Sequence, residues 1–199
     1  MANSISSVTT GTGGIVLESV DTSGNTNIKS GTTTIVAVTS TGAAVTGTLS
    51  ASGGIAKASL PTGSVLQVVN ATYSTQVSTT TTTYVDTGLT ATITPTSATS
   101  KILVIVDHAD VFKNTGNTGC GQQLLRGASI LAIISKYAAD NNSTVYGMVG
   151  GCGINYLDSP ATTSATTYKT QINSTQNVAN AGINFQNSTS TITLMEIAA

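Results

Sequence analysis

Charged residues are scarce in this sequence. Seven Lys and Arg residues and eight Asp and Glu residues make up 8% of the 199-residue chain, and the formal net charge is -1. A nucleic-acid partner requires an excess of cationic side chains to neutralise phosphates, so the composition excludes that class. One His (His108) and one Arg (Arg126) leave few groups for acid–base chemistry or metal binding. We therefore expect no nucleic-acid partner, no cofactor and no metal site.

Aromatic residues are also few: there is no Trp, and aromatic residues amount to 4% of the chain. A glycosidase needs two carboxylates about 5–9.5 Å apart, in a groove that usually carries stacking aromatic side chains. The chain has only two Glu, and the remaining acids in its C-terminal part include Asp107, Asp110, Asp140 and Asp158. It also lacks the Gly-x-Ser-x-Gly motif of serine hydrolases. These shortages predict a non-enzymatic protein and disfavour a polysaccharide-degrading spike.

The chain has only two cysteines and no long apolar run. Cys120 and Cys152 could form one bridge, but without a Cys-x-x-Cys motif or a Cys/His cluster we expect two unpaired, buried thiols. The longest run of Ile, Leu and Val spans residues 102–106, too short to cross a bilayer. The first ten residues lack the basic and apolar segments of a signal peptide. We expect a soluble protein made in the cytoplasm, with no membrane insertion.

Small hydroxyl residues dominate what is present. There are 38 Thr and 23 Ser, or 61 of 199 residues, together with 20 Gly. The chain is 39% hydrophobic, which does not fit solvated disorder. Thr and Val at this density, with little Glu and Lys, favour β-structure throughout. The composition therefore predicts an all-β fold.

Residues 1–60 form a series of short segments separated by glycines. Apolar clusters at residues 15–17 and 35–38 alternate with Gly and Asn/Gly turns, which predicts short strands. The region contains no aromatic residue and too few apolar side chains for an independent monomeric core. We interpret it as an N-terminal anchor and a thin β shaft, stabilised by three intertwined copies that share their apolar faces. The alternative is a flexible Gly/Ser/Thr linker.

Residues 61–199 show a stronger strand pattern, which begins after the breaker sequence around Pro61 and Gly63. Residues 89–94 alternate with period two, placing Leu89, Ala91 and Ile93 on one face. Residues 122–126 and 129–134 flank a glycine and predict a hairpin; a helix over residues 131–140 is the weaker alternative. Ten or so short strands in this region predict an antiparallel β-sandwich head of jelly-roll type.

Several stretches resemble a known family. They are residues 66–69, 73–77, 78–89, 91–104, 124–127, 156–169 and 188–199, and residues 38–53 are similar to repeating shaft segments. In this order they resemble the C-terminal domain of short bacteriophage fibre proteins, especially those of phages that infect cyanobacteria and other aquatic bacteria. The resemblance implies a trimeric virion appendage and transfers no catalytic residue.

Candidate binding residues lie in Asn-rich loops, at the ends of strands where binding loops usually sit. Amide and phenol groups can hydrogen-bond sugars, so the candidates for a glycan site are Asn114, Asn117, Tyr137, Asn141, Asn142 and Tyr146. We expect His108 to be a polar residue where its strand reaches the surface, or a trimer contact; three copies around an axis binding an ion are a remote alternative. Arg126 is expected to pair with an Asp, or to contact a carboxylate of a partner chain.

The sequence therefore predicts a bacteriophage virion protein, assembled in the host cytoplasm and released by lysis. We expect a homotrimeric short fibre or spike that attaches to capsid or tail proteins through residues 1–60. Its head, residues 61–199, would contact host surface glycan through many weak sites. A capsid decoration protein whose head needs no ligand is the principal alternative.

Overall fold

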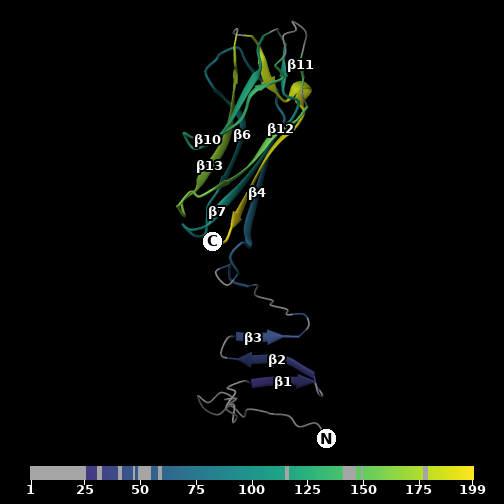
Figure 1. Cartoon of the computed structure of the whole chain (residues 1–199), viewed down its shortest axis with the longest axis vertical. Coiled ribbons are helices and arrows are strands. Elements are labelled where there is room, and N and C mark those ends of the chain that lie inside the picture. The colour runs from purple at the N-terminus through teal and green to yellow at the C-terminus, as the bar shows by residue number, and fades with distance from the viewer. Residues whose placement is uncertain are drawn as a thin grey trace. The chain divides into compact units, whose positions relative to one another are not determined.

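The computed structural model describes residues 26–30, 33–39, 42–46, 48, 55–57, 60–114, 117–140, 147–148, 150–176 and 179–199. The chain divides between residues 55 and 56 into two compact units, an N-terminal unit and a head. Every sheet pairing in both units is antiparallel, and the described residues contain no α-helix (Figure 1). The prediction of an all-β fold is confirmed.

The N-terminal unit contains one three-stranded sheet in the order β1-β2-β3. Its strands are β1 (Thr26–Ser30), β2 (Thr33–Thr39) and β3 (Gly42–Val45). The apolar side chains Ile28, Val38 and Val45 are 46%, 44% and 37% exposed. The short strands predicted from the sequence are thus present within residues 26–45. The predicted strand segment at residues 15–17 lies outside the described residues. Among the described residues of this unit, no second layer covers these apolar side chains.

The head is built from two long four-stranded sheets and a small one. The β4 sheet has the order β12-β7-β15-β4, the β6 sheet β10-β9-β13-β6, and the small sheet β11-β8-β14-β5. The strands are β4 (Val65–Tyr73), β5 (Val77–Thr79), β6 (Val85–Ile93), β7 (Lys101–His108), β8 (Phe112–Lys113), β9 (Cys120–Arg126), β10 (Ser129–Ala138), β11 (Gly147–Met148), β12 (Cys152–Asp158), β13 (Thr166–Ser174), β14 (Ala181–Ile183) and β15 (Ser190–Ile197).

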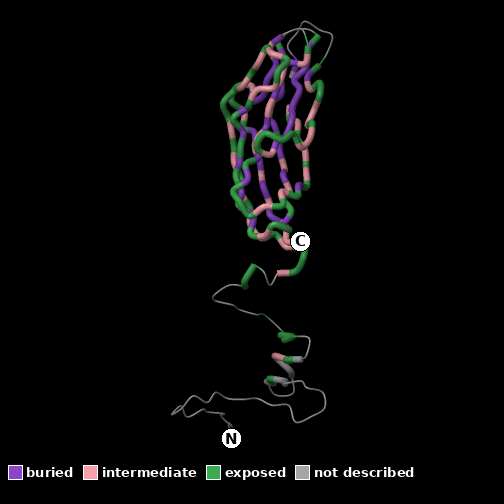
Figure 2. Tube along the Cα trace, turned by 90° about the vertical axis from the view of Figure 1, so that its left-hand side faces the viewer, coloured by how far each residue is buried: buried purple, intermediate pink, exposed green. Residues whose placement is uncertain are grey.

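The two long sheets pack face to face as a β-sandwich. Strand β6 alternates exposed and buried residues, so that Leu89, Ala91 and Ile93 face inward as predicted. They join one core cluster with residues of the opposite sheet, including Val104 on β7 and Leu194 on β15. Buried residues accordingly line the interior of the head in Figure 2. This period-two burial is the physical basis of the sandwich, because each strand gives one apolar side to the shared core.

The head has two ends, an entry end and a loop end. At the entry end the backbone NH of Gly63 donates to Ala198 O, beside the first residue of β4 and the last of β15. At the loop end, where β4 and β7 finish, lies the small sheet together with a 3₁₀ turn at Phe185–Asn187 (Figure 1). A second cluster around Val111, Ile172 and Ile183 forms the core there.

The β9–β10 pair confirms the predicted hairpin. Arg126 pairs with Ser129 across a turn in which Gly127 has a φ of 57°. Strand β10 continues to Ala138, so the region expected to be strand or helix is a strand. Its pairing with β9 shifts register three times, which turns Ile130 and Ile133 outward while Leu131 and Ile134 pack on the core.

Candidate functional site

His108 lies inside the sandwich, and the expectation that it reaches the surface is wrong. Its side chain is 0% exposed, at the last position of β7. Nδ1 lies 2.6 Å from Gln122 Oε1 on β9, and Nε2 lies 2.9 Å from Thr170 Oγ1 on β13. With Gln122 accepting from Nδ1–H, Nε2 accepts from the Thr170 hydroxyl. The burial follows from strand parity, because His108 shares the inward face with Val104 and Val106.

The surroundings of His108 give it a structural role rather than a place in a reactive site. Burial lowers the pKa of the imidazole from its ordinary value, which keeps the ring neutral, although the hydrogen bond to Gln122 and the charge of Asp107 act in the opposite direction. Both ring nitrogens already have partners from the same chain. Among the described residues, no group of three or more His, Cys, Asp or Glu side chains gathers as metal ligands would. The ring therefore joins the two sheets through hydrogen bonds.

Arg126 pairs with a carboxylate of its own chain, as expected for one of its two predicted roles. Its Nη1 lies 2.9 and 2.7 Å from the two oxygens of Asp158, and the Tyr168 hydroxyl donates to Asp158 Oδ2 at 2.7 Å. Burial, together with this contact to Asp158, raises the pKa of Tyr168 above its ordinary value. The Arg126 side chain remains 32% exposed, so its part in a contact between copies stays a prediction.

The two cysteines are unpaired thiols. Cys120 on β9 is buried, whereas Cys152 on β12 is half-buried and packs against the same cluster. Burial raises the pKa of each thiol above its ordinary value, which disfavours the reactive thiolate. The expectation of full burial is therefore met at Cys120 and only partly at Cys152.

Three of the six predicted glycan-binding residues fall within the described residues. Asn114 and Asn117 are both exposed, and they flank the loop between β8 and β9 at the loop end of the head. Tyr137 is 58% exposed near the end of β10. The other three, Asn141, Asn142 and Tyr146, lie outside the described residues.

Tyr137 belongs to an open pocket of about 210 Å³ on the β6-sheet side of the loop end. The pocket brings together two phenol rings, one ammonium group, one amide, one hydroxyl and one aliphatic side chain. These belong to Tyr84, Ile133, Lys136, Tyr137, Asn173 and Thr175. Among the described residues no carboxylate pairs with Lys136, and no carboxylate lines the pocket.

Hydrogen bonds to β13 hold Tyr84 in this pocket. Ser174 N donates to Thr81 O at 2.9 Å, and Asn173 Nδ2 donates to Thr82 O at 2.8 Å. These bonds tie the segment before β6 to the end of β13. Asn173 Oδ1 has no partner among the described residues and lies over Gly121, where a side chain would not fit. Burial raises the pKa of Tyr84, so its hydroxyl stays protonated and can donate a hydrogen bond.

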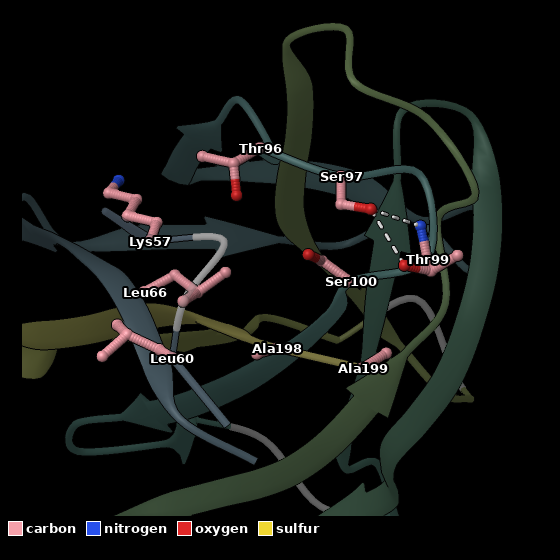
Figure 3. Close-up of a pocket in the computed structure, with 9 residues that line it drawn as sticks. All are labelled: Lys57, Leu60, Leu66, Thr96, Ser97, Thr99, Ser100, Ala198 and Ala199. Atoms are coloured by element: carbon pink, nitrogen blue, oxygen red, sulfur yellow. Dashed lines mark hydrogen bonds between the residues drawn. The ribbon is translucent and has the colours of Figure 1, made fainter. Parts of the chain in front are cut away.

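A larger pocket of about 440 Å³ lies at the entry end (Figure 3). Hydroxyl side chains of the β6–β7 turn form one wall, and Ser97 Oγ accepts from Thr99 N at 3.2 Å. The opposite wall contains Leu60, Leu66 and Ala198. None of its lining residues is aromatic, and Lys57 supplies its one charged side chain. This lining suits a sugar less well than the smaller pocket around Tyr84 and Tyr137, called the tyrosine pocket, because it offers no ring face for stacking.

Sequence reasoning found Tyr137 but missed Tyr84 and Lys136. The signal for Tyr137 was its place beside an Asn-rich loop, whereas Tyr84 lies far from it in the sequence. Only the pairing of β13 with β6 and β9, together with that of β9 with β10, brings the two tyrosines to one pocket. Lys136 precedes Tyr137 directly, so its charge was visible in the sequence, but its place in a pocket was not.

The comparison with known proteins found no matching family model and no matching characterised relative. The resemblance to phage fibres therefore stays a prediction from the sequence. Among the described residues, no helix is long and apolar enough to span a membrane. What the head offers chemically is an open pocket lined by two phenol rings, an ammonium group and an amide.

Proposed function

We propose that the protein is a non-enzymatic bacteriophage virion protein, a homotrimeric short fibre whose head contacts glycan on the host surface. Its N-terminal region attaches to capsid or tail proteins. The observation that carries the proposal is the contrast between the two units. The head has its own buried core, whereas the N-terminal sheet exposes Ile28, Val38 and Val45.

The exposed N-terminal sheet supports assembly from several copies. A small three-stranded sheet without a covered apolar face is marginal in water. Identical copies around one axis would cover these side chains with each other, and closed symmetric assemblies are the common solution among soluble homo-oligomers. A trimeric shaft of this kind is the form that the sequence resemblance implies.

The strand order of the head supports a jelly roll. Numbered along the chain from β4 to β15 without the strands of the small sheet, the long strands follow the order 1-8-3-6 in the β4 sheet and 2-7-4-5 in the β6 sheet. Strands next to each other in sequence thus alternate between sheets or form the β9–β10 hairpin, as in two interlocked Greek keys. Jelly rolls occur in viral capsid and lectin domains, so the fold suits a virion protein without specifying its ligand.

The tyrosine pocket is the glycan site of this proposal. Tyr84 and Tyr137 offer ring faces and hydroxyls, and Lys136 offers a cation with no opposing carboxylate in the pocket lining. Sugar rings stack on aromatic faces, and an ammonium group favours sugars that carry carboxylate or sulfate. The ligand class is therefore an acidic surface polysaccharide. Because the pocket is open and small, each contact is weak, and attachment depends on three heads and many copies per particle.

The burial of two carboxylates disfavours them as hydrolytic acids and fits a binding role. Asp158 is held by Arg126 and Tyr168, and Glu196 is held by Thr96 and Gln67. Both side chains point into the head and are almost fully buried. A glycosidase would need such acids facing the sugar in a groove.

A polysaccharide array tests the proposed function. Fluorescent full-length protein is applied to bacterial surface polysaccharides, both uncharged and carboxylated. We expect saturable binding to carboxylated members, and a loss of about tenfold in affinity in Tyr137→Ala or Lys136→Ala, because an aromatic contact contributes about 0.5–1.5 kcal/mol and a hydrogen bond to a charged group about 1.5–3 kcal/mol. Thr92→Ala, an exposed change on the outer face of β6, is the matched control.

Two outcomes would contradict the glycan site. One is no saturable binding to any polysaccharide or to intact host cells, which would favour the role of a capsid decoration protein. The other is binding that is equally unaffected by the pocket changes and by Thr92→Ala, which would place the ligand elsewhere on the head.

A further inference from the structure

The outer face of the β4 sheet carries apolar side chains in register across all four strands. Leu157 on β12 lies beside Leu103 on β7, which lies beside Met195 on β15, followed by Val68 on β4. The inward residues on either side of this row, such as Val104 and Leu194, are fully buried. Strand parity therefore turns the row away from the core, and Leu157 and Val68 are 53% and 55% exposed.

Apolar side chains on this face are concentrated in the half nearer the entry end. The row nearest that end contains Val65 on β4 and Ile197 on β15, with Lys101 on β7 beside Ile197. Beyond the row of Leu157 and Val68, Ile105 lies between the polar neighbours Asn155 and Thr193. The charged residues that β7 contributes to this face, Lys101 and Asp107, lie toward its opposite ends. We call the apolar part the β4 face; it consists of Val65, Val68, Leu103, Ile105, Leu157, Met195 and Ile197.

The outer face of the β6 sheet has a different character. A polar network crosses it, in which Lys169 and Gln171 on β13 both bond to Asp86 on β6, and Gln123 on β9 donates to Gln171. Its exposed aliphatic side chains, Ile130 and Ile133, belong to the edge strand β10. The two faces of one sandwich therefore differ, and the β4 face is the one suited to contact another protein surface.

The size of the β4 face indicates what kind of partner it can hold. Four strands at about 4.8 Å spacing, over four residue steps of about 3.4 Å, give an apolar area of roughly 260 Å². A stable interface between independent proteins needs about 800 Å² on each side. The face is therefore too small to hold a free partner, but large enough to align surfaces that are already tethered together.

We propose that the β4 face is the surface through which the heads of different copies of this chain contact one another. This inference rests on the proposed trimer, in which the exposed N-terminal sheets hold the copies together. Residues 46–64 connect β3 to β4 and reach at most about 65 Å. Heads confined within that distance of a shared sheet have an effective concentration on the order of 1 mM, at which a small apolar contact is populated.

The exposed N-terminal sheets also favour another copy of this chain, rather than a different protein, as the partner of the β4 face. Each copy needs partners for its own Ile28, Val38 and Val45, so identical heads are the surfaces present at highest local concentration. In a threefold arrangement the β4 faces turn toward the common axis, with Val65 and Ile197 nearest the tether. The tyrosine pocket lies on the β6-sheet side and stays free to bind.

Site-specific photocross-linking of the full-length chain tests this surface. Benzoylphenylalanine replaces Val68 on β4 or Leu157 on β12, and in the control it replaces Thr92, an exposed residue on the outer face of β6. The mass in solution is measured first, and a trimer is expected at about 60 kDa, three times the 19.9 kDa chain. After illumination we expect about tenfold more cross-linked chain from positions 68 and 157 than from position 92, because an occupied face keeps the reagent against its partner.

The outcomes separate this inference from the proposed function. A trimeric mass with equal cross-linking at positions 68, 157 and 92 overturns the β4 face as the contact and leaves the trimer standing. A trimeric mass with cross-links only from a reagent placed at Val38 also overturns it, because copies are then joined through the N-terminal sheet alone. A mass of one chain overturns both. A second variant, Val68→Thr/Leu157→Thr, makes the β4 face more polar but keeps residues that favour strands. With benzoylphenylalanine placed at Leu103, this variant should give several-fold less cross-linked chain, while the head still melts cooperatively.

Discussion

Glu196 is a buried carboxylate whose ionisation contributes to the stability of the head. Its Oε1 accepts hydrogen bonds from Thr96 N and Thr96 Oγ1, both at 2.7 Å, and its Oε2 accepts one from Gln67 Nε2 at 2.6 Å. Burial raises the pKa of this carboxyl, but these donors outweigh it and lower the pKa to about 2. The bonds attach β15 to the β6–β7 turn and to β4, at the entry end of the sandwich.

Replacing Glu196 with Gln should destabilise the head in a pH-dependent way. At neutral pH the change sets an NH₂ group against the present donors, at a cost of about 2–3 kcal/mol in unfolding free energy. Because the pKa is about 2 in the folded chain and 4.5 as the ordinary value, the ionic contribution is complete above pH 4.5 and is lost as the pH falls toward 2. Urea unfolding of wild type and variant should therefore show a gap at pH 7 that narrows near pH 2.5.

The exposed Asp140→Asn change is the control for this measurement and should leave stability nearly unchanged at both pH values. A gap between wild type and Glu196→Gln that stays constant from pH 7 to pH 2.5 would contradict the ionic account.

Neither Glu196 nor His108 could have been identified from the sequence as a buried polar residue. Glu196 stands near the end of the chain, and its donors Gln67 and Thr96 are distant in sequence. His108 appeared to end a strand at the surface, but its partners Gln122 and Thr170 come from strands of the other sheet. Both assignments depend on which strands face each other across the core, and side-chain alternation along one strand does not contain that information.

At the scale of elements, β14 is held closely between two neighbours. It pairs with β5 on one side and β8 on the other, and Gly182 lies opposite both Ser78 and Phe112. A methyl group at Gly182 would overlap the carbonyl oxygen of Val77 and approach the Phe112 ring to 2.9 Å. The small sheet thus depends on a residue without a side chain in its central strand.

Gly182→Ala should therefore cost about 2–4 kcal/mol, because a backbone carbonyl must move to admit the methyl group. Gly151→Ala is the matched control: its methyl group would meet the side-chain carboxylate of Asp107 at 3.1 Å and the His108 carbonyl oxygen at an ordinary 3.7 Å, and should cost less than about 1 kcal/mol. Thermal melts of the two variants provide the comparison. Equal melting temperatures would contradict the close packing of β14.

Elements with strong local signals were predictable from the sequence. Leu89, Ala91 and Ile93 revealed β6 by alternation, and the glycine at position 127 between two apolar runs revealed the β9–β10 hairpin. The short strands β8, β11 and β14 have two or three residues each and carry no such period. The tyrosine pocket was found only in part for a similar reason: Tyr137 has a local signal, whereas Tyr84 reaches the pocket through the hydrogen bonds of the preceding segment to β13.

At the scale of the whole molecule, the two units differ in where their stability comes from. The head places residues such as Ile102, Leu124 and Ile192 in a core closed by two sheets, each 0% exposed. The N-terminal unit has one described sheet, in which Ile28, Val38 and Val45 are at least 37% exposed. Burial of apolar surface is the main favourable contribution to folding. We therefore expect the head to fold as a monomer and the N-terminal sheet to fold only when several copies associate.

Separate expression of the two units tests this difference. A fragment of residues 56–199 should melt cooperatively, with an unfolding free energy of about 5–15 kcal/mol that does not depend on protein concentration. A fragment of residues 1–55 should lack strand signal in circular dichroism when dilute, because its exposed Ile28 and Val38 gain nothing from folding as a monomer. Fusing it to a foreign trimerisation domain should restore that signal, since three tethered copies can then cover one another's apolar faces. A dilute, monomeric 1–55 fragment with full strand content would contradict the proposal that the N-terminal sheet folds only when several copies associate.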